Sequence, residues 1–511
     1  MFRMFSKGLA MAVSAPIARW FLLAAAALVG LLAGLHSGAC CAADVAAGEP
    51  SALAAVAVIE QAMVSAIARA EKSLAAIARV RRDDGRRPVE TRPDPFARRI
   101  SPLAQPQPTD PDFVPNEYAS GVVVDAAGLI LTAAHVLGPD SDYYVTTNDR
   151  KVYKAIIKAA DPRSDLAVLA IEARGLTPIT LGDGAALRKG QIVIALGNPY
   201  AIARDGQPSA AWGIVSNVHR KAPPWPDPAD PTGKPTLHHF GTLIQTDARL
   251  NVGTSGGALV NLRGEMVGLI VAPPAAAGYE SAAGYAIPVD GTFRRAVEQL
   301  KQGREVEYGF LGVQPLNLSA QQRLEGVFGA RVERIVQGTP AARAGLRPDD
   351  VITAVNGKPI YEADGLVLEV GRLPVQSTAR LAVLRGGKQR ELTATLGKYP
   401  VRGVRIVTAP APAWRGMRVD YPTVLLDGQL RPHSGASGLE EGAAVVEVVP
   451  GSAAWNAGLR TGMVITHVGR TAIDGPTQFH QAVAALRGPV QLRLAGTPPT
   501  TVTVGEDESK P

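Results

Sequence analysis

The feature that most limits how this chain can fold is a series of short apolar runs within residues 120–271. GVVVD, LILTAAHVL, DLAVLAI, QIVIALG and MVGLIV are rich in Val, Ile and Leu, and Gly, Asp, Asn or Pro separates them. Many short strands with turn residues between them are typical of an all-β barrel or sandwich. A Pro-rich stretch, residues 222–235, interrupts the series and is predicted to be an exposed loop.

An internal repeat constrains the C-terminal half. Residues 338–355 (GTPAARAGLRPDDVITAV) match residues 451–468 (GSAAWNAGLRTGMVITHV) at a constant offset of 113 residues. A period near 100 residues indicates a duplicated domain, because the repeats of a solenoid are far shorter. The stretch VTAPAPAW, residues 407–414, lies between the copies and is predicted to belong to a linker.

The N-terminus has the pattern of an export signal. Arg3, Lys7 and Arg19 precede an apolar run over residues 20–35, and small residues follow as far as Ala43. Cleavage after Ala43 is the prediction. The alternative is an uncleaved membrane anchor, although the apolar run is short for a membrane span.

Composition argues against several other classes of protein. The formal net charge is +7, and three of the positive charges lie in the signal, so a clustered basic face for nucleic acid is not expected. Cys40 and Cys41 are the only cysteines and leave with the signal, so the mature protein has no disulfide or thiol nucleophile. This composition suits a bacterial envelope compartment. The histidine cluster of His219 with His238 and His239 lacks metal-site spacing, and neither a metal nor a cofactor is expected.

The segment after the signal is predicted to begin with a helix. Residues 52–70 are Ala-rich and apolar enough to need a partner surface. Residues 73–80 (SLAAIARV) are predicted to form a first strand, and residues 81–116, rich in Arg, Pro and Asp, a solvated loop.

Three residues are candidates for chemistry. Ser255 lies in GTSGGAL (253–259), where glycine on both sides allows a tight turn whose N–H groups can converge on an oxyanion. His135, in LTAAHVL, is a candidate general base, and Asp165, thirty residues later, could fix its tautomer. Each residue alone has a structural interpretation, as a loop serine, a core histidine or a strand cap. Together they follow the order His, Asp, Ser of chymotrypsin, which agrees with the β-rich pattern.

The motifs resemble those of the HtrA/Deg family of serine proteases. The matching segments are LTAAHVL, DPRSDLAVL, LGNP (196–199), GIVS (213–216), QTDARLNVGTSGGALV (245–260) and GYAIP (284–288), followed by PDZ-like repeats. The resemblance runs from about Leu74 to the end of the second repeat. It implies a mainly β protein, with a chymotrypsin-like double β-barrel protease domain followed by two PDZ (α+β) domains. It also implies ATP-independent cleavage of misfolded or unfolded polypeptide in the periplasm by a homo-oligomer, a trimer or a multiple of one.

The resemblance gives the following domain boundaries: 1–43 signal peptide, 44–72 N-terminal helical segment, 73–300 protease domain, 306–399 first PDZ domain, 400–413 linker and 414–506 second, divergent PDZ domain. By the same motifs His135, Asp165 and Ser255 match the catalytic triad.

Gly253, Thr254 and Ser255 match the oxyanion loop of the family. The family usually reads NPGNSGGPL, whereas this chain reads NVGTSGGAL, so that Val252 stands where proline is usual. Loss of proline removes a restraint on φ. We therefore expect an oxyanion loop that is looser at rest and ordered by substrate or a partner.

The specificity pocket is predicted to be apolar. Arg249 stands six residues before Ser255, where a trypsin-like preference would need an acid. Leu250, Ile270 and Tyr285 are predicted to line a pocket for small or medium aliphatic side chains.

PDZ domains bind a peptide as an added strand, and a loop of backbone amides holds its C-terminal carboxylate. In the first copy this carboxylate loop is predicted to consist of Gly309, Phe310, Leu311 and Gly312. The counterpart in the second copy, WRGMRV (414–419), departs from the pattern. Arg415 and Arg418 could aid carboxylate capture or be solvated, and peptide capture by this copy is less secure.

Two alternative functions stay open. One is a chaperone or scaffold on a protease-like fold, which the altered oxyanion loop would favour. The other is a membrane-anchored regulatory protease, which retention of residues 1–43 would favour. Contact with a membrane is expected only in that second case.

Overall fold

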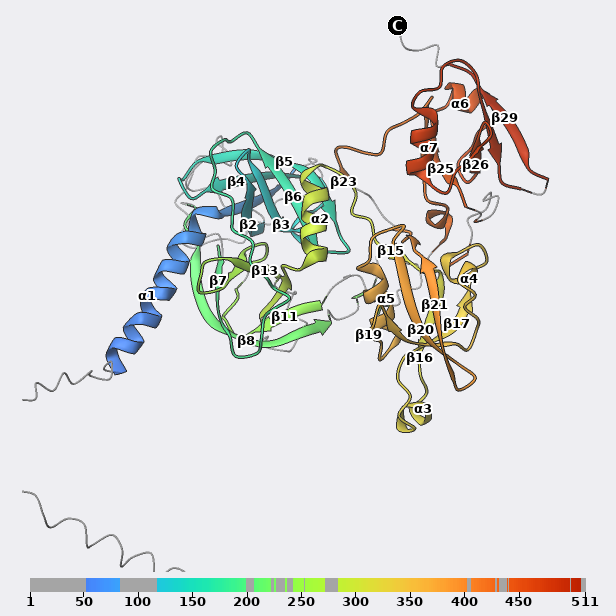
Figure 1. Ribbon diagram of the computed structural model, residues 1–511. Helices are drawn as coiled ribbons and strands as arrows, with labels where there is room; N and C mark the ends of the chain where they lie inside the picture. The colour runs from blue at the N-terminus through green and yellow to red at the C-terminus, as the bar shows by residue number, and fades with distance from the viewer. Residues whose placement is uncertain are drawn as a thin grey trace, which may run out of the picture. The chain divides into compact units, whose positions relative to one another are not determined.

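The computed structural model describes residues 52–82, 117–198, 206–221, 225–226, 235–236, 242–251, 253–271, 284–401, 406–427, 430–431, 439, 441–496 and 498–506 (Figure 1). The predictions for the signal, for residues 83–116 and for most of the Pro-rich stretch fall outside these residues.

The predicted N-terminal helix is present as α1 (Ala52–Ala70). The 3-10 turn η1 (Glu71–Ser73) follows it, and the predicted first strand is β1 (Leu74–Arg81). Ala66 and Ala70 of α1 are buried in the core of the protease domain. Within the described residues, one stretch, Leu53–Ser73, is long and apolar enough to cross a membrane, and 11% of its most apolar window is buried.

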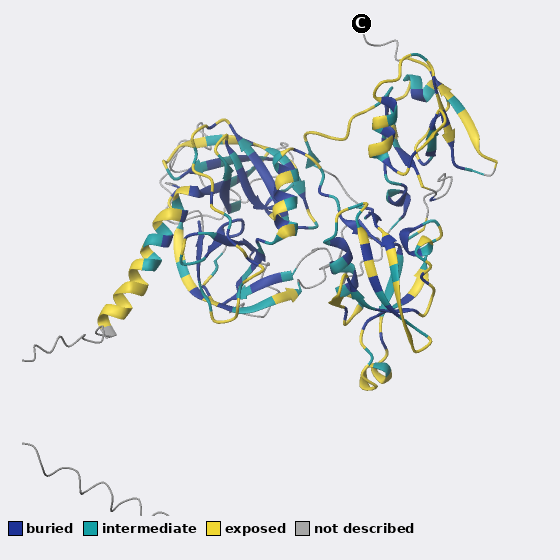
Figure 2. Cartoon of the chain, viewed as in Figure 1, coloured by how far each residue is buried: buried dark blue, intermediate teal, exposed yellow. Residues whose placement is uncertain are grey.

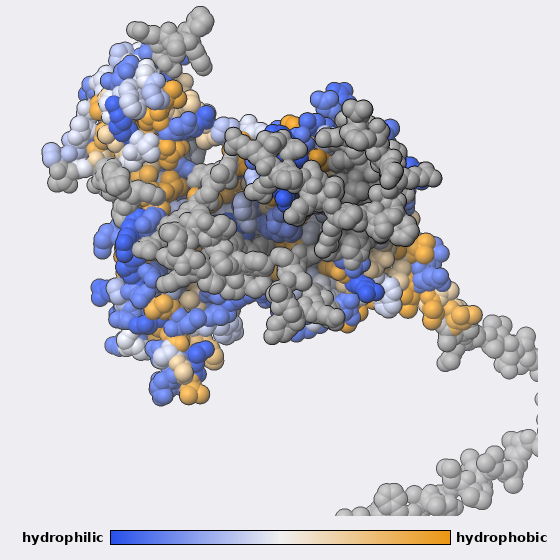
Figure 3. Space-filling view, turned by 180° about the vertical axis from the view of Figure 1, so that it is seen from behind, coloured by the Kyte–Doolittle hydropathy of each residue, from blue (hydrophilic) through white to orange (hydrophobic). Residues whose placement is uncertain are grey.

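Much of α1 is exposed and apolar. Figure 2 shows the helix largely in the colour of exposed residues, and in Figure 3 apolar side chains gather beside the grey trace that continues from it. The exposed apolar side chains of the helix are Leu53, Val56, Val58, Ile59 and Val64.

The first barrel of the protease domain is closed and antiparallel. Its strands follow the order β5-β4-β1-β2-β3-β6, and pairing of β5 with β6 closes it. Side chains of β4 alternate between buried and half-buried, the period of two expected of a strand with one face on a core. Strand β23 (Ile406–Val407), from the predicted linker, pairs with Ala159 and Ala160 of β5, beyond the residues that pair with β4. The remaining bounds are β2 (Glu117–Asp125), β3 (Leu129–Ala133), β4 (Ser141–Thr147), β5 (Val152–Asp161) and β6 (Leu166–Ile171).

The second barrel is also closed, in the order β11-β14-β13-β12-β7-β8. Its strands are β7 (Ile192–Gly197), β8 (Ser209–Lys221), β11 (Thr242–Thr246), β12 (Ala258–Val260), β13 (Met266–Val271) and β14 (Gly284–Pro288). The predicted double barrel is therefore confirmed. The stretch predicted to be a loop contains one short antiparallel pair, β9 (Trp225–Pro226) with β10 (Pro235–Thr236).

Helix α2 (Gly291–Lys301) ends the protease domain. The side chain of Asp290 caps it by accepting a hydrogen bond from the Phe293 N–H at 2.9 Å. Its apolar face, with Phe293 and Leu300, packs on the first barrel.

The two repeats fold into domains with the same strand order, which we call PDZ1 and PDZ2. The sheet of PDZ1 follows β16-β17-β18-β20-β21, and that of PDZ2 follows β24-β25-β26-β28-β29. In PDZ1 the elements are β15 (Gly309–Phe310), β16 (Val313–Asn317), α3 (Ala320–Leu324), β17 (Ala330–Ile335), α4 (Pro340–Arg343), β18 (Val351–Val355), β19 (Lys358–Pro359), α5 (Ala363–Gly371), β20 (Thr378–Arg385), β21 (Lys388–Thr395) and β22 (Gly397–Lys398). In PDZ2 they are β24 (Met417–Asp420), η4 (Pro422–Leu425), β25 (Ala443–Val448), α6 (Ala453–Asn456), β26 (Val464–Val468), β27 (Thr471–Ala472), α7 (Pro476–Val483), β28 (Val490–Leu494) and β29 (Thr500–Val504).

Candidate active site

His135 and Asp165 form a tightly oriented pair in the first barrel. His135 lies in the 3-10 turn η2 (Ala134–Val136), directly after β3. Its ring Nδ1 lies 2.7 Å from Oδ2 of Asp165, and its backbone N–H donates to Oδ1 of the same carboxylate at 2.9 Å. Both carboxylate oxygens are thus engaged, so the imidazole is held in one orientation with Nε2 available for proton transfer.

The segment that carries Asp165 is held by a buried carboxylate four residues earlier. Oδ2 of Asp161 accepts hydrogen bonds from the N–H and the hydroxyl of Ser164, at 3.0 and 2.5 Å. The hydroxyl of Tyr308, which is fully buried, also donates to Asp161. Burial raises the pKa of Asp161 despite these donors. Asp165 itself has a φ of 54°, a left-handed conformation that few residues other than glycine adopt.

Two opposing effects set the pKa of His135. Burial on its own lowers it, but the hydrogen bond and the negative charge of Asp165 together outweigh burial, so the pKa of His135 is raised. A histidine with this balance can accept a proton from a serine hydroxyl and is stabilised as an imidazolium once it has done so.

Ser255 lies in the turn before β12, which we call the nucleophile loop (residues 253–257). Gly256 has a φ of 83°, and a Cβ there would lie 2.3 Å from Oγ1 of Thr132 and 3.2 Å from the N atom of Ala133. Only glycine fits this close approach. The structure therefore brings the nucleophile loop of the second barrel against the end of β3, two residues before His135.

Gly253 and Thr254, two of the predicted oxyanion residues, have a defined backbone conformation. Gly253 has a φ of 96°, and Thr254 bonds the carbonyl of Asn251 through both its N–H, at 3.1 Å, and its hydroxyl, at 2.7 Å. Val252 lies outside the described residues, so the expected looseness of the loop stays a prediction.

The predicted pocket residues pack against two core clusters. Leu250 packs against the core cluster of the second barrel that contains Ile270, and Ile270 has no exposed surface. Tyr285 instead packs against the other core cluster of the protease domain. Most of the segment between β13 and β14 lies outside the described residues, and the apolar pocket remains a prediction.

The predicted carboxylate loop of PDZ1 is open: Gly309 and Phe310 lie in β15, and Leu311 and Gly312 connect that strand to β16. Leu311 is buried with its carbonyl accepting from the Ala341 N–H at 2.8 Å. Of the four loop residues only Gly312 has a positive φ, 87°.

The counterpart in PDZ2 is a closed turn. Trp414 and Met417 exchange two backbone hydrogen bonds, 2.8 and 3.0 Å long, and Arg415 and Gly416 between them have φ values of 48° and 81°. Positive φ at both central residues is the mark of a type I′ turn.

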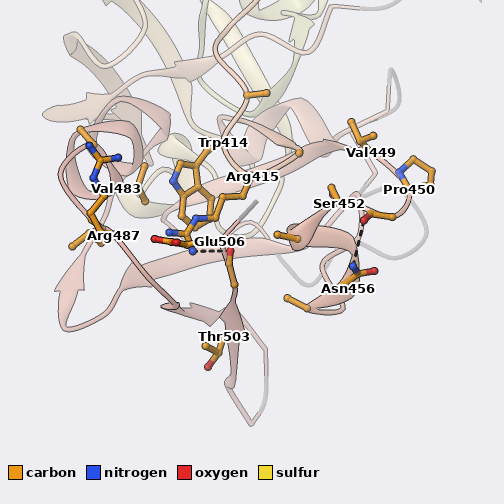
Figure 4. A pocket seen from close by; sticks show the side chains of 18 residues that line it. Trp414, Arg415, Val449, Pro450, Ser452, Asn456, Val483, Arg487, Thr503 and Glu506 are labelled. Atoms are coloured by element: carbon orange, nitrogen blue, oxygen red, sulfur yellow. Dashed lines mark hydrogen bonds between the residues drawn. The ribbon is translucent and has the colours of Figure 1, made fainter. Parts of the chain in front are cut away.

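Arg415 is directed into its own domain. Its guanidinium donates to the carbonyls of Val504, Gly505 and Gly488 at 2.6–2.8 Å and lies 4.6 Å from the ring centre of Trp414. Figure 4 shows Arg415 among the residues that line a pocket of about 1450 Å³, together with Arg487 and Glu506. Arg418 pairs with Glu447 at 2.9 Å. Both arginines that were candidates for carboxylate capture are therefore engaged within the protein.

Comparison with known proteins agrees with this geometry. A model of the trypsin-like peptidase domain matches residues 119–269, and a PDZ domain model matches residues 309–396. The chain is 32% identical over 391 residues to a probable DegP-like periplasmic serine endoprotease of Chlamydia muridarum, covering 75% of this chain and 72% of that protein. It is 30% identical over 432 residues to the periplasmic pH-dependent serine endoprotease DegQ of Escherichia coli, covering 83% of this chain and 87% of the other. The chain belongs to the HtrA/Deg family of serine proteases.

As an HtrA/Deg protein, the chain is a chymotrypsin-like serine endopeptidase with PDZ domains. Solved structures agree. The HtrA-type protease AlgW with a tripeptide superposes with a TM-score of 0.50 and 26% identity, covering 66% of this chain and 98% of that one.

The sequence analysis missed three residues that the structure places around the active site. They are Ser120, Asp161 and Tyr308. Ser120 could have been noticed as a hydroxyl among the small and apolar residues of ASGVVV, and Asp161 as the first acid of DPRSD. Tyr308 gives no local signal, because its partner Asp161 is 147 residues away.

Proposed function

We propose that this HtrA/Deg protein is exported to the periplasm and cleaves unfolded polypeptides there, without ATP, through His135, Asp165 and Ser255. The observation that carries this proposal is the doubly bonded His135–Asp165 pair beside the loop of Ser255. His135 accepts the proton of Ser255 while its oxygen attacks the peptide carbonyl carbon. Asp165 holds the ring and stabilises its protonated form.

The rest of the cycle follows from the same groups. The N–H groups of Gly253 and Ser255 stabilise the oxyanion of the tetrahedral intermediate. His135 then gives its proton to the leaving amine, and an acyl-enzyme remains on Ser255. Water, deprotonated by His135, releases the new C-terminus. Substrate would reach the site with help from PDZ1, which captures C-terminal peptides at Gly309–Gly312 and raises their local concentration.

The decisive experiment compares the protein lacking residues 1–43 with its Ser255→Ala variant on unfolded casein. We expect cleavage by the first and at least about a thousandfold slower cleavage by the second, since loss of a triad nucleophile removes most of the rate enhancement. A fluorophosphonate probe, which reacts only with an activated serine, should label the first protein alone. Equal cleavage by both proteins would overturn the assignment of Ser255.

The pH profile tests the role of the His135–Asp165 pair. Because His135 must be neutral to act as a base and Asp165 raises its pKa, kcat/KM should fall on the acid side of a pKa above about 6.5. Asp165→Asn removes the charge, so we expect this pKa to drop and kcat to fall by about 10⁴-fold. An unchanged acid limb in that variant would show that another group titrates.

A homo-oligomer built from trimers is the second part of the proposal. The exposed apolar side chains of α1, among them Val58, Ile59 and Val64, support it, because contact between copies would remove them from water. Light scattering should give three times the chain mass or a multiple of it. Val64→Glu should lower that mass, and a wild-type mass of one chain would contradict the proposal.

A further inference from the structure

Ser120 places a buried hydroxyl behind the nucleophile loop. It lies on β2 of the first barrel and has no exposed surface. Its Oγ donates a hydrogen bond to the carbonyl of Gly253 at 2.8 Å and accepts one from the N–H of Asn198 at 2.7 Å. One side chain therefore joins β2, the end of β7 and the first residue of the loop.

The backbone of Ser120 contacts the same loop a second time. Its N–H donates to the carbonyl of Ser255 at 2.8 Å, and its own carbonyl accepts from the hydroxyl of Thr132 at 2.8 Å. The backbone N–H, the carbonyl and the hydroxyl of Ser120 thus all have partners. The hydroxyl proton has a defined acceptor, the Gly253 carbonyl, which fixes the orientation of the side chain.

The packing around Ser120 is tight. A Cβ on Gly197 would lie 3.1 Å from Oγ of Ser120 and 3.1 Å from Cα of Thr254. A Cβ on Gly256 would lie 2.2 Å from the carbonyl oxygen of Ser120. Loss of the hydroxyl would therefore leave the Asn198 N–H and the Gly253 carbonyl without their partner.

The direction of these bonds matters for catalysis. In a loop whose N–H groups at Gly253 and Ser255 point to the oxyanion, the carbonyls of the same residues must find partners elsewhere. Ser120 supplies the partner for both carbonyls. It thereby restrains the Gly253–Thr254 peptide plane, which lies between the two oxyanion donors, and the Ser255–Gly256 plane directly after them.

We propose that Ser120 is a positioning residue that holds the oxyanion loop in its active form through the Gly253 carbonyl. This inference rests on the proposed function, in which Gly253 and Ser255 supply the oxyanion donors. Its effect belongs to the transition state, because the oxyanion exists only after attack by Ser255. Removal of the hydroxyl should therefore lower kcat and leave KM nearly unchanged.

The test compares Ser120→Ala with Ser141→Ala in the protein lacking residues 1–43. Ser141 is a matched control, since it is also a buried serine of the first barrel, bonded to Arg79 and to the Pro139 carbonyl and making no hydrogen bond to the nucleophile loop. We expect kcat on a peptide substrate to fall roughly 10- to 100-fold in Ser120→Ala, less than for loss of an oxyanion donor itself, with KM within about twofold. Ser141→Ala should keep the wild-type kcat.

A second readout separates positioning from a general structural role. A peptide boronic acid forms a tetrahedral adduct with Ser255 whose oxygen occupies the oxyanion site as an anion would, whereas an uncleaved peptide on a Ser255→Ala background presents only a neutral carbonyl, which these donors bind weakly. Ser120→Ala should lower the affinity for the boronic acid by about the same factor as it lowers kcat. The affinity for the uncleaved peptide should stay unchanged. Unchanged boronic acid affinity, or an equal kcat loss in Ser141→Ala, would overturn the inference.

Two further controls keep the result interpretable. Ser120→Cys keeps the shape of the side chain, but its thiol is a weak hydrogen-bond donor. If Ser120→Ala is unfolded at the assay temperature, the same measurements are made on Ser120→Cys. Ser255→Ala is assayed alongside. Full activity in that variant would refute the proposed function, whereas an inactive Ser255→Ala beside a fully active Ser120→Ala would refute the role of Ser120 alone.

Discussion

PDZ1 and PDZ2 repeat one fold at an offset of 113 residues over most of their length, yet their carboxylate loops differ. The support of each loop is the same: Ala341 donates to the carbonyl of Leu311 in PDZ1, and Ala454 donates to that of Arg415 in PDZ2. The loop itself is open in PDZ1 and closed into a turn in PDZ2, where Trp414 and Met417 bond each other.

Two domains with the same scaffold therefore need not have the same binding site. Where PDZ1 has the buried Leu311, PDZ2 has Arg415, which binds three carbonyls of its own domain. The N–H groups of Trp414 and Met417 are consumed within the turn and cannot hold a peptide carboxylate. Trp414 also packs edge-on against Phe479 of α7, with ring centres 5.6 Å apart. We therefore expect C-terminal peptides to bind at PDZ1 and not at PDZ2.

The largest expected difference between the two domains comes from substitution of the equivalent glycines, Gly312 and Gly416. A Cβ at Gly312 would lie 2.3 Å from Thr339, and one at Gly416 would lie 2.1 Å from Ser452, both at positive φ. Alanine should therefore strain both loops by a similar amount, about 1–2 kcal/mol or more. Only Gly312→Ala should weaken peptide binding, by about tenfold or more.

The measurement is fluorescence anisotropy with a labelled peptide ending in an apolar residue, on the full chain carrying Ser255→Ala. The same peptide with an amidated C-terminus is the control for carboxylate capture. Equal weakening by Gly416→Ala would show that PDZ2 also binds.

A smaller effect should come from substitution of Leu311 in PDZ1 and of its counterpart Arg415 in PDZ2. Leu311→Ala should destabilise PDZ1 by about 2–4 kcal/mol, because it opens a cavity under the loop. Arg415→Ala should destabilise PDZ2 by about 1–3 kcal/mol, because three carbonyls lose their donor. Hydrogen exchange of β17 and β18 against β25 and β26 in the full chain reports each loss locally. Faster exchange in both domains from one substitution would contradict the expectation that each substitution destabilises only its own domain.

The smallest expected effect is a pH dependence of stability that PDZ2 has through helix α7 and that helix α5 does not give to PDZ1. His480 of α7 stands where α5 has Val367, and its Nε2 is buried with no hydrogen-bond partner among the residues that the structure describes. Burial lowers the pKa of His480, so the stability that depends on its neutral form is present above about pH 6.5 and is lost as pH falls below that value. His480→Val should stabilise PDZ2 by about 0.5 kcal/mol near pH 5, discounted because the ring is partly exposed.

Hydrogen exchange of β26 at pH 5 and pH 8 tests this effect. The wild-type chain should lose protection at the lower pH relative to the variant, after correction for intrinsic exchange. Identical pH dependence in both proteins would remove His480 from the comparison.

Sequence patterns predicted the double barrel, the repeat and the pairing of His135 with Asp165, because these depend on local periodicity and on short motifs. The closed turn of PDZ2 was not predictable, since it needs a positive φ at Arg415, which side-chain-bearing residues rarely adopt. Ser120 was missed for another reason. Its hydroxyl bonds Gly253 across 133 residues, and only the folded barrels bring the two together.

The left-handed conformation of Asp165 limits how this position can change during evolution. Asparagine, aspartate and glycine tolerate a φ near 54° best, and of these only aspartate is an acid. Glutamate keeps the charge but not the backbone preference, and asparagine keeps the preference but not the charge. No single substitution therefore preserves both properties. Any replacement of Asp165 is expected to lower activity or stability, so active enzymes should retain aspartate at this position.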